Sequence, residues 1–174
     1  MAPADSVGPA LVIIDVQAGF ISEYTERCLP RIHELARSGR FEAVIATRFS
    51  NPEGSPFRRL IGWSRLATDE EIALDPVVEK HADLIIDKVT YGAGAELESA
   101  LRARGIVEAT IVGIDTDVCV LHNAAALFDR GFTVPVDLGG CATNGGPDAD
   151  AAAVPLLRRT IGGNQVIPRA DTAS

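Results

Sequence analysis

The run Ile111-Val-Gly-Ile-Asp-Thr-Asp-Val-Cys-Val120 passes from an apolar strand into a helix and places Cys119 at the turn between them. A thiol at a helix N-terminus faces the positive end of the helix dipole and unpaired backbone N–H groups, so we expect a lowered pKa for Cys119. A nucleophile and an oxyanion site would then come from the same turn. The alternative for this segment is a small buried core cysteine, the state of most lone cysteines.

Strand-like and helix-like segments alternate along the rest of the chain. A continuous apolar run at 10–16 predicts a strand buried on both faces. Further strands are expected at 42–49, 83–88, 108–114, 132–138 and 164–167. Helices are expected at 29–36, 95–104, 118–130 and 147–160, with one or two helical turns near 57–63. This alternation predicts a three-layer α/β/α domain built on a six-stranded parallel sheet.

Bulk composition sets limits on the class of protein. The 174 residues fit one domain, which we place at 9–174 behind a flexible segment at 1–8. A formal net charge of −8 argues against a nucleic-acid partner. No apolar run reaches the ~18 residues that would span a membrane, and the N-terminus does not resemble a signal peptide.

The cysteines are few and scattered. Cys28, Cys119 and Cys141 form neither a disulfide framework nor a zinc-ligand spacing. We therefore expect a reducing, cytoplasmic location and read Cys28 and Cys141 as structural.

Polar residues stand directly after three of the predicted strands. Asp15, Lys88 and the turn before Cys119 each follow a run rich in isoleucine and valine. In parallel sheets, ligands bind beyond the carboxyl ends of the strands. Each residue also has a structural reading. Asp15 could cap a turn, Lys88 could be a solvated strand end, and Asp117 or Thr116 could be the helix N-cap.

These three residue types can perform acyl transfer together. A thiol needs a base or a neighbouring cation to become a nucleophile. Asp15 could accept the thiol proton and later return it to a leaving amine, while Lys88 would favour the thiolate. Backbone N–H groups of the turn before Cys119 would hold the tetrahedral intermediate. This chemistry, through a thioester, requires no metal and no cofactor.

The residues also resemble a known family. The segments Ile14-Asp-Val-Gln-Ala-Gly-Phe20, Lys88-Val-Thr-Tyr91 and Gly113-Ile-Asp-Thr-Asp-Val-Cys-Val120 are similar to the three signature segments of the isochorismatase-like cysteine hydrolases. That superfamily includes nicotinamidases, N-carbamoylsarcosine amidohydrolases, ureidoacrylate hydrolases and isochorismatases. The resemblance implies the sheet order 3-2-1-4-5-6 and homo-oligomers, either dimers or tetramers.

The resemblance assigns roles to individual positions. It implies that Asp15, Lys88 and Cys119 are the catalytic residues. It further implies a cis peptide between Ile114 and Asp115, which would aim the backbone N–H groups of Asp115 and Cys119 into an oxyanion hole. Lys88 starts two strands away and must reach inward on its long side chain.

Departures from the family pattern narrow the expected chemistry. Nicotinamidase-type members carry an Asp-x-His metal motif after the second strand, where this chain has Phe49 and Asn51. The histidines are scattered at His33, His81 and His122, so we expect no metal site. True isochorismatases lack the cysteine, and its presence here favours C–N bond hydrolysis. The segment 92–95 lacks an expected phenylalanine, which predicts a wider pocket, and the departure at 137–141 has no sequence-level explanation.

Four residues are candidates for the substrate pocket: Phe20, Arg48, Trp63 and Tyr91. Arg48 could bind a substrate carboxylate in a bidentate manner, although a surface arginine is as plausible. Core packing explains the aromatic residues nearly as well. His122 follows Cys119 by three positions but would point poorly at the sulfur.

We therefore expect a metal-independent cysteine hydrolase that acts on a small amide, ureido or carbamoyl compound. Gln17 replaces the second carboxylate that magnesium-dependent phosphoryl transfer would need. The alternative from another class is a catalytically silent binding or assembly subunit, because a fold does not guarantee a function. A thiol redox sensor would lack a nearby resolving cysteine.

Overall fold

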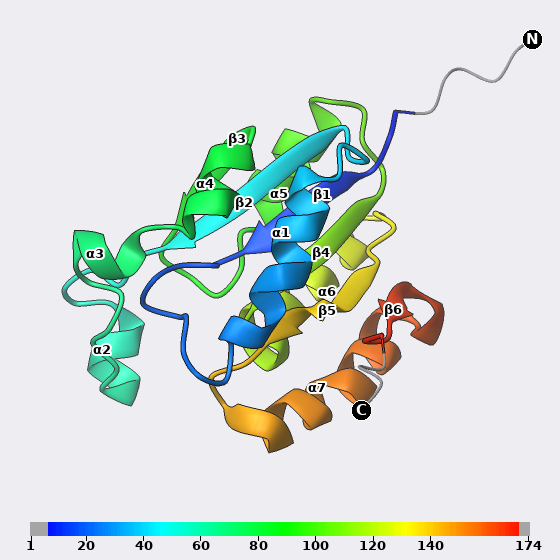
Figure 1. Ribbon diagram of the computed structural model, residues 1–174. Coiled ribbons are helices and arrows are strands. Elements are labelled where there is room, and N and C mark those ends of the chain that lie inside the picture. The colour runs from blue at the N-terminus through cyan, green and yellow to red at the C-terminus, as the bar shows by residue number, and fades with distance from the viewer. Residues whose placement is uncertain (1–6, 171–174) are drawn as a thin grey trace, which may run out of the picture.

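A computed structural model describes residues 7–170, which form a six-stranded sheet flanked by helices (Figure 1). Every strand pair is parallel, and the strand order is β3-β2-β1-β4-β5-β6. The strands are β1 (Ala10–Ile14), β2 (Ala43–Phe49), β3 (Leu84–Lys88), β4 (Ala109–Ile114), β5 (Val136–Ala142) and β6 (Val166–Ile167). The predicted fold class and strand order are confirmed.

Helices cover both faces of this sheet. The helices are η1 (Glu26–Cys28), α1 (Leu29–Arg37), α2 (Pro56–Ile61), α3 (Asp69–Ile72), α4 (Pro76–His81), α5 (Gly94–Arg102), η2 (Thr116–Val120), α6 (Leu121–Asp129), α7 (Gly146–Ile161) and η3 (Gly163–Gln165). Helices α1 and α4 pack together on one face, while α5, α6 and α7 form the layer on the other (Figure 1). None of the helices among residues 7–170 is both long and apolar enough to cross a membrane.

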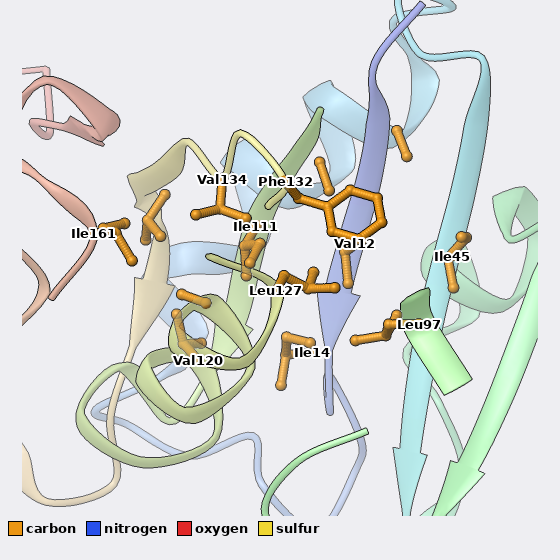
Figure 2. Close-up of a cluster of buried hydrophobic side chains, with 14 of the residues drawn as sticks. Val12, Ile14, Ile45, Leu97, Ile111, Val120, Leu127, Phe132, Val134 and Ile161 are labelled. Atoms are coloured by element: carbon orange, nitrogen blue, oxygen red, sulfur yellow. The ribbon is translucent and has the colours of Figure 1, made fainter. Parts of the chain in front are cut away.

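The hydrophobic core lies on both sides of the central strand. All five residues of β1 are buried, as a strand covered on two faces requires. Figure 2 shows the cluster beneath α5 and α6, where Val12 and Ile14 of β1 meet Leu97 and Leu127 of those helices. A second cluster, beneath α1 and α4, includes Ile13 and Ile32. This packing fixes the strand ends that carry the polar residues.

Strand β5 begins later in the chain than predicted. The sequence suggested 132–138, whereas the strand spans Val136–Ala142 and runs through two glycines. At Gly140 an added Cβ would lie 2.6 Å from Val112 Cγ1, so the close approach of β4 requires a glycine. Asp137 at the start of the strand binds Arg31 of α1 at 2.8 Å. These contacts explain why Asp137 and Gly140 stand in this segment.

The long segment 50–78 contains more helix than its sequence suggested. Besides the predicted turns near 57–63, which form α2, it holds α3 and α4. Each has a side-chain N-cap: Ser55, Thr68 and Asp75 accept hydrogen bonds from backbone N–H groups of the first turn. The segment therefore forms an ordered wall beside the sheet. Of the segment predicted to be flexible, residues 1–6 lie outside the described residues.

Candidate active site

Asp15 follows β1 directly and is completely buried. Its φ of 50° lies in the left-handed region, which is uncommon for a residue other than glycine. Thr47 of β2 holds this conformation, because its hydroxyl accepts the Asp15 N–H at 3.1 Å and donates to Oδ1 at 2.7 Å. The second carboxylate oxygen, Oδ2, is thereby left to face Lys88.

Lys88, the last residue of β3, reaches Asp15 across the intervening strand. Its Nζ lies 2.6 Å from Asp15 Oδ2. The ammonium also donates hydrogen bonds to the carbonyl oxygens of Thr90 at 2.9 Å and Tyr91 at 3.1 Å, so one carboxylate and two carbonyl groups surround the buried charge. On the way it passes over the Phe49 ring, 5.1 Å from the centroid. A buried charge requires such complete pairing.

Cys119 lies in the helical segment η2, which follows β4 after a cis peptide bond between Ile114 and Asp115. This segment is a single wide turn of π-helix, whereas the sequence suggested the start of a regular α-helix. The thiol is 7% exposed and borders a cavity. Asp15, Lys88 and Cys119 thus meet at the carboxyl edge of the sheet.

The expected lowering of the Cys119 pKa is wrong. Burial raises the pKa of this thiol, and the charge of Asp15 and a hydrogen bond to Asp15 raise it further. The ammonium of Lys88 acts in the opposite direction but does not offset burial. The resting sulfur is therefore a thiol rather than a thiolate, and it needs a base at the moment of attack.

The cavity beside Cys119 is small and largely aromatic. Its volume is about 190 Å³. The lining residues are Phe20, Phe49, Phe57, Ile61, Trp63, Tyr91, Asp115, Val118 and Cys119. The rings touch one another, with Phe20 stacked on Trp63 at 5.9 Å and Phe57 edge-on to Tyr91 at 4.9 Å between centroids. Three of the four predicted pocket residues, Phe20, Trp63 and Tyr91, line this cavity.

Arg48 is the predicted pocket residue that the structure places elsewhere. Side chains alternate along a strand, so Thr47 and Phe49 face the site while Arg48 points to the opposite face of the sheet. There its guanidinium forms a bidentate pair with Asp87, with contacts of 2.7 and 3.1 Å. Arg48 therefore does not line this cavity, and the alternative given above, an arginine outside the site, agrees with the structure.

Sequence reasoning missed the Phe49 and Phe57 walls of the cavity. Gln17 fixes Phe49 by accepting its N–H at 2.8 Å and donating to its carbonyl oxygen at 2.8 Å. Phe57 comes from α2 and packs edge-on to Phe49. The apolar spacing near 57–63 indicated a helix, but nothing local indicated which side chain would reach the site.

Asn123 is a second residue that the sequence did not single out. It is fully buried one helical turn after Cys119. Its Nδ2 donates to the carbonyl oxygens of Cys119 at 2.8 Å and Tyr91 at 3.2 Å, and its Oδ1 accepts the N–H of Ala93 at 2.8 Å. This side chain connects the turn that carries Cys119 to the loop that holds the Lys88 ammonium.

The loop at 92–95 does not widen the pocket. An added Cβ at Gly92 would lie 2.7 Å from the His122 ring, and one at Gly94 would lie 2.8 Å from Ala126. The space left by these glycines is thus filled by α6, and His122 packs beside Tyr91 with 6.2 Å between ring centroids. The expectation of a wider wall here is wrong.

The donor groups near the site do not fit a divalent metal. Phe49 places a ring, and not a ligand, in the cavity. Asn51 donates to the carbonyl oxygens of Trp63 and Arg65 and accepts the Ser55 hydroxyl, so its amide is used in holding the loop. Within residues 7–170, no cluster of three or more histidine, cysteine or carboxylate side chains has a ligand-like arrangement.

A buried cysteine, carboxylate and ammonium at the carboxyl edge of a doubly wound sheet define a class of α/β proteins with a preformed small-molecule site. Comparison with known proteins identifies the family. The family model described as the isochorismatase domain matches residues 9–166. The chain therefore belongs to the isochorismatase family.

Individual relatives extend this comparison. An uncharacterised isochorismatase family protein, PncA, from Bacillus subtilis (strain 168) is 37% identical over 67 residues, which cover 35% of this chain and 37% of that protein. The crystal structure of nicotinamidase PncA from Bacillus subtilis superposes with a TM-score of 0.79 and 26% identity, covering 93% of this chain and 100% of that one.

A more distant structure shares the fold. N-carbamoylsarcosine amidase from Thermoplasma acidophilum superposes with a TM-score of 0.76 and 22% identity, covering 97% of this chain and 99% of that one.

Proposed function

We propose that this protein is a metal-independent cysteine hydrolase that cleaves a C–N bond of a small amide, ureido or carbamoyl compound. The observation that carries this proposal is the position of Asp15, whose carboxylate lies 2.6 Å from the Lys88 ammonium and close enough to Cys119 to shift the pKa of its thiol, which borders an apolar cavity. Asp15 can thus deprotonate the Cys119 thiol while the Lys88 ammonium compensates the negative charge of Asp15.

In the first half of the proposed reaction, the Cys119 sulfur attacks the amide carbonyl carbon as its proton moves to Asp15. The carbonyl electron pair moves to oxygen, and the backbone N–H groups of Asp115 and Cys119 stabilise this oxyanion. Collapse of the tetrahedral intermediate breaks the C–N bond. The proton on Asp15 moves to the departing nitrogen, and the acyl group remains on sulfur as a thioester.

In the second half, water attacks the thioester carbon and gives its proton to Asp15. The C–S bond breaks, the acid product leaves, and the proton returns to the sulfur. Lys88 bonds to Asp15 throughout and acts as a fixed countercharge. The raised pKa of Cys119 suits this cycle, because the proton needed by the leaving amine is on the enzyme at the start.

The comparisons support the amide class. The similar structures include a nicotinamidase and, with the fold alone in common, an N-carbamoylsarcosine amidase. The residues of this chain differ from a metal-anchored site at Phe49 and Asn51, so the proposed reaction involves no metal. A small-molecule substrate fits the cavity of about 190 Å³.

A screen of small primary amides, ureido acids and carbamoyl compounds for ammonia release tests this function. We expect turnover of at least one compound, a loss of at least about a thousandfold in kcat/KM for Cys119→Ala, and no change for Cys28→Ala. Chelation should leave the rate unchanged. Failure to hydrolyse any compound would favour a silent binding subunit, and activity that is lost on chelation would overturn the metal-free mechanism.

A further inference from the structure

The charge of the cavity wall restricts what can bind there. Among the described residues that line it, Asp115 has the only charged side chain, and none is a lysine, arginine or histidine. Lys88 lies behind the wall, where its ammonium pairs with Asp15 and donates to two carbonyl oxygens, and Arg48 points to the opposite face of the sheet. A substrate carboxylate would therefore meet no cation in this cavity.

The Asp115 carboxylate stands where the cavity meets a neighbouring outer groove, since the residue lines both. Its Oδ1 accepts the N–H of Asn144 at 2.8 Å and the Asn144 side-chain amide at 3.1 Å. These two bonds fix the carboxylate and leave Oδ2 to accept from a ligand. Burial raises the pKa of Asp115, so a cation beside it would relieve a desolvated charge.

The surrounding charges have the same sign. Asp15 and Asp117 act on Asp115 as like charges, although Lys88 balances Asp15. The outer groove adds Glu23 and Arg65. Glu71 lies 3.7 Å from Arg65 and compensates its positive charge. The region beside Asp115 is therefore negative overall, which favours a positively charged ligand.

Aromatic faces complete the site for a cation. Phe20 and Trp63 are stacked on each other and line both the cavity and the outer groove next to Asp115. An ammonium group close to such rings is attracted by their negative faces, and Trp is the strongest of these partners. A wall of aromatic rings combined with one carboxylate favours an ammonium group over a carboxylate at this end of the cavity.

We propose that this site selects small amides whose acyl part carries an ammonium group, with Asp115, Phe20 and Trp63 as the residues that recognise it. The inference rests on the hydrolase function proposed above and adds the substrate class. A cavity of about 190 Å³ has room for roughly ten non-hydrogen atoms at protein packing density. The amide then lies at Cys119, and the ammonium lies at the rim beside Asp115.

Three amides of the same non-hydrogen atom count isolate the effect of charge. Trimethylammonioacetamide is cationic, 3,3-dimethylbutanamide is its neutral isostere with carbon in place of nitrogen, and succinamate is anionic. The first two have the same shape, but the ammonium also makes the neighbouring carbonyl intrinsically more reactive by induction. That difference is the same for every variant, so the change of their kcat/KM ratio between the wild type and a variant measures charge recognition. We expect this ratio to be at least about ten, and succinamate to be turned over at least about a hundredfold more slowly than the cation.

Variants assign that ratio to residues. Asp115→Asn retains the backbone N–H and the shape of the side chain, and Trp63→Leu removes a ring. Each should reduce the kcat/KM ratio of cationic to neutral substrate by at least about threefold relative to the wild type, whatever happens to the absolute rate. Arg48→Gln is the matched control, because this charge lies outside the cavity, and it should leave the ratio unchanged.

Calorimetric binding to the Cys119→Ala variant separates this proposal from the hydrolase function. Tighter binding of the cationic amide than of its neutral isostere supports charge recognition even where no amide is hydrolysed. Equal or weaker binding and turnover of the cation overturn it while leaving the hydrolase function intact. A cation preference that survives both Asp115→Asn and Trp63→Leu overturns the assignment to these residues.

Discussion

Lys88 is the residue on which the geometry of the site depends most. Its side chain is 3% exposed and that of Asp15 is fully buried, so each charge is compensated by the other and not by water. The two carbonyl oxygens of the loop at 90–91 complete the shell of the ammonium. This pair accounts for the buried carboxylate in a strained backbone conformation next to the nucleophile.

Replacing Lys88 by Met should lower the free energy of unfolding by about 3–5 kcal/mol, because Asp15 would be left as an uncompensated buried charge. Urea unfolding monitored by circular dichroism measures this change. Adding Asp15→Asn to the variant should recover part of the loss. Asp87→Asn, which breaks an exposed pair on the same strand, is the control and should cost less than about 1 kcal/mol. A cost below about 1 kcal/mol for Lys88→Met would contradict the buried pairing.

At the scale of elements, the site depends on strands that approach closely. Gly113 of β4 has φ of 134°, and an added Cβ there would lie 2.2 Å from the Ile14 carbonyl oxygen. Gly140 of β5 is confined in the same way by Val112. At both positions the neighbouring strand leaves no room for a side chain, so the glycines allow β1, β4 and β5 to approach closely near Asp15 and Cys119.

The Gly140→Ala substitution should destabilise the protein by about 1–3 kcal/mol, since the new methyl group overpacks against Val112. Thermal or urea unfolding checks this value. Gly163→Ala is the matched control, because no atom lies within 4 Å of the position that its Cβ would take. A change within about 0.5 kcal/mol is expected there. Equal effects of both substitutions would argue against the close packing of β5.

Most elements could be predicted from sequence because their signals are local. The apolar run of β1 shows its burial on both faces directly. The position of β5 could not be predicted in this way, since Gly139 and Gly140 resemble a turn until the packing of β4 and α1 against them is known. Helix α4 is short and depends on its Asp75 cap.

For the site, too, local sequence signals could be predicted and features that depend on tertiary packing could not. The strand-end positions of Asp15, Lys88 and Cys119 follow from the sequence pattern and from the family resemblance, and their catalytic roles stay a prediction. The direction of the Cys119 pKa shift does not follow, because it depends on burial by segments far away in the chain. The face of the sheet on which Arg48 lies could likewise not be predicted without the register of β2 and β3.

At the scale of the whole molecule, all three cysteines are buried thiols. Burial raises the pKa of Cys28 from its ordinary value of 9.0 to about 12 and raises those of Cys119 and Cys141 as well. In the unfolded chain the thiols lose their protons near pH 9, while the folded protein retains them. The unfolded state then binds fewer protons, so stability must fall as the pH rises.

We expect the contribution of the thiols to the free energy of unfolding to be constant below pH 9 and to fall between pH 9 and about 12. Each cysteine contributes a slope of about 1.4 kcal/mol per pH unit. Urea unfolding at a series of pH values measures the slope. Cys28→Ala should make it shallower by one such contribution, and an identical slope in this variant would show that the thiol is not protected by burial.

The proposed reaction requires the Cys119 sulfur to form a bond to a substrate carbonyl carbon. The most direct test is ¹³C NMR of the aldehyde analogue of an amide that the protein hydrolyses, labelled at the carbonyl carbon and bound to the protein. We predict that its resonance moves to the tetrahedral range of a thiohemiacetal with the wild type and stays trigonal or hydrated with Cys119→Ala. Binding with an unchanged trigonal carbonyl in the wild type, or a thiohemiacetal that persists in Cys119→Ala, would contradict the mechanism.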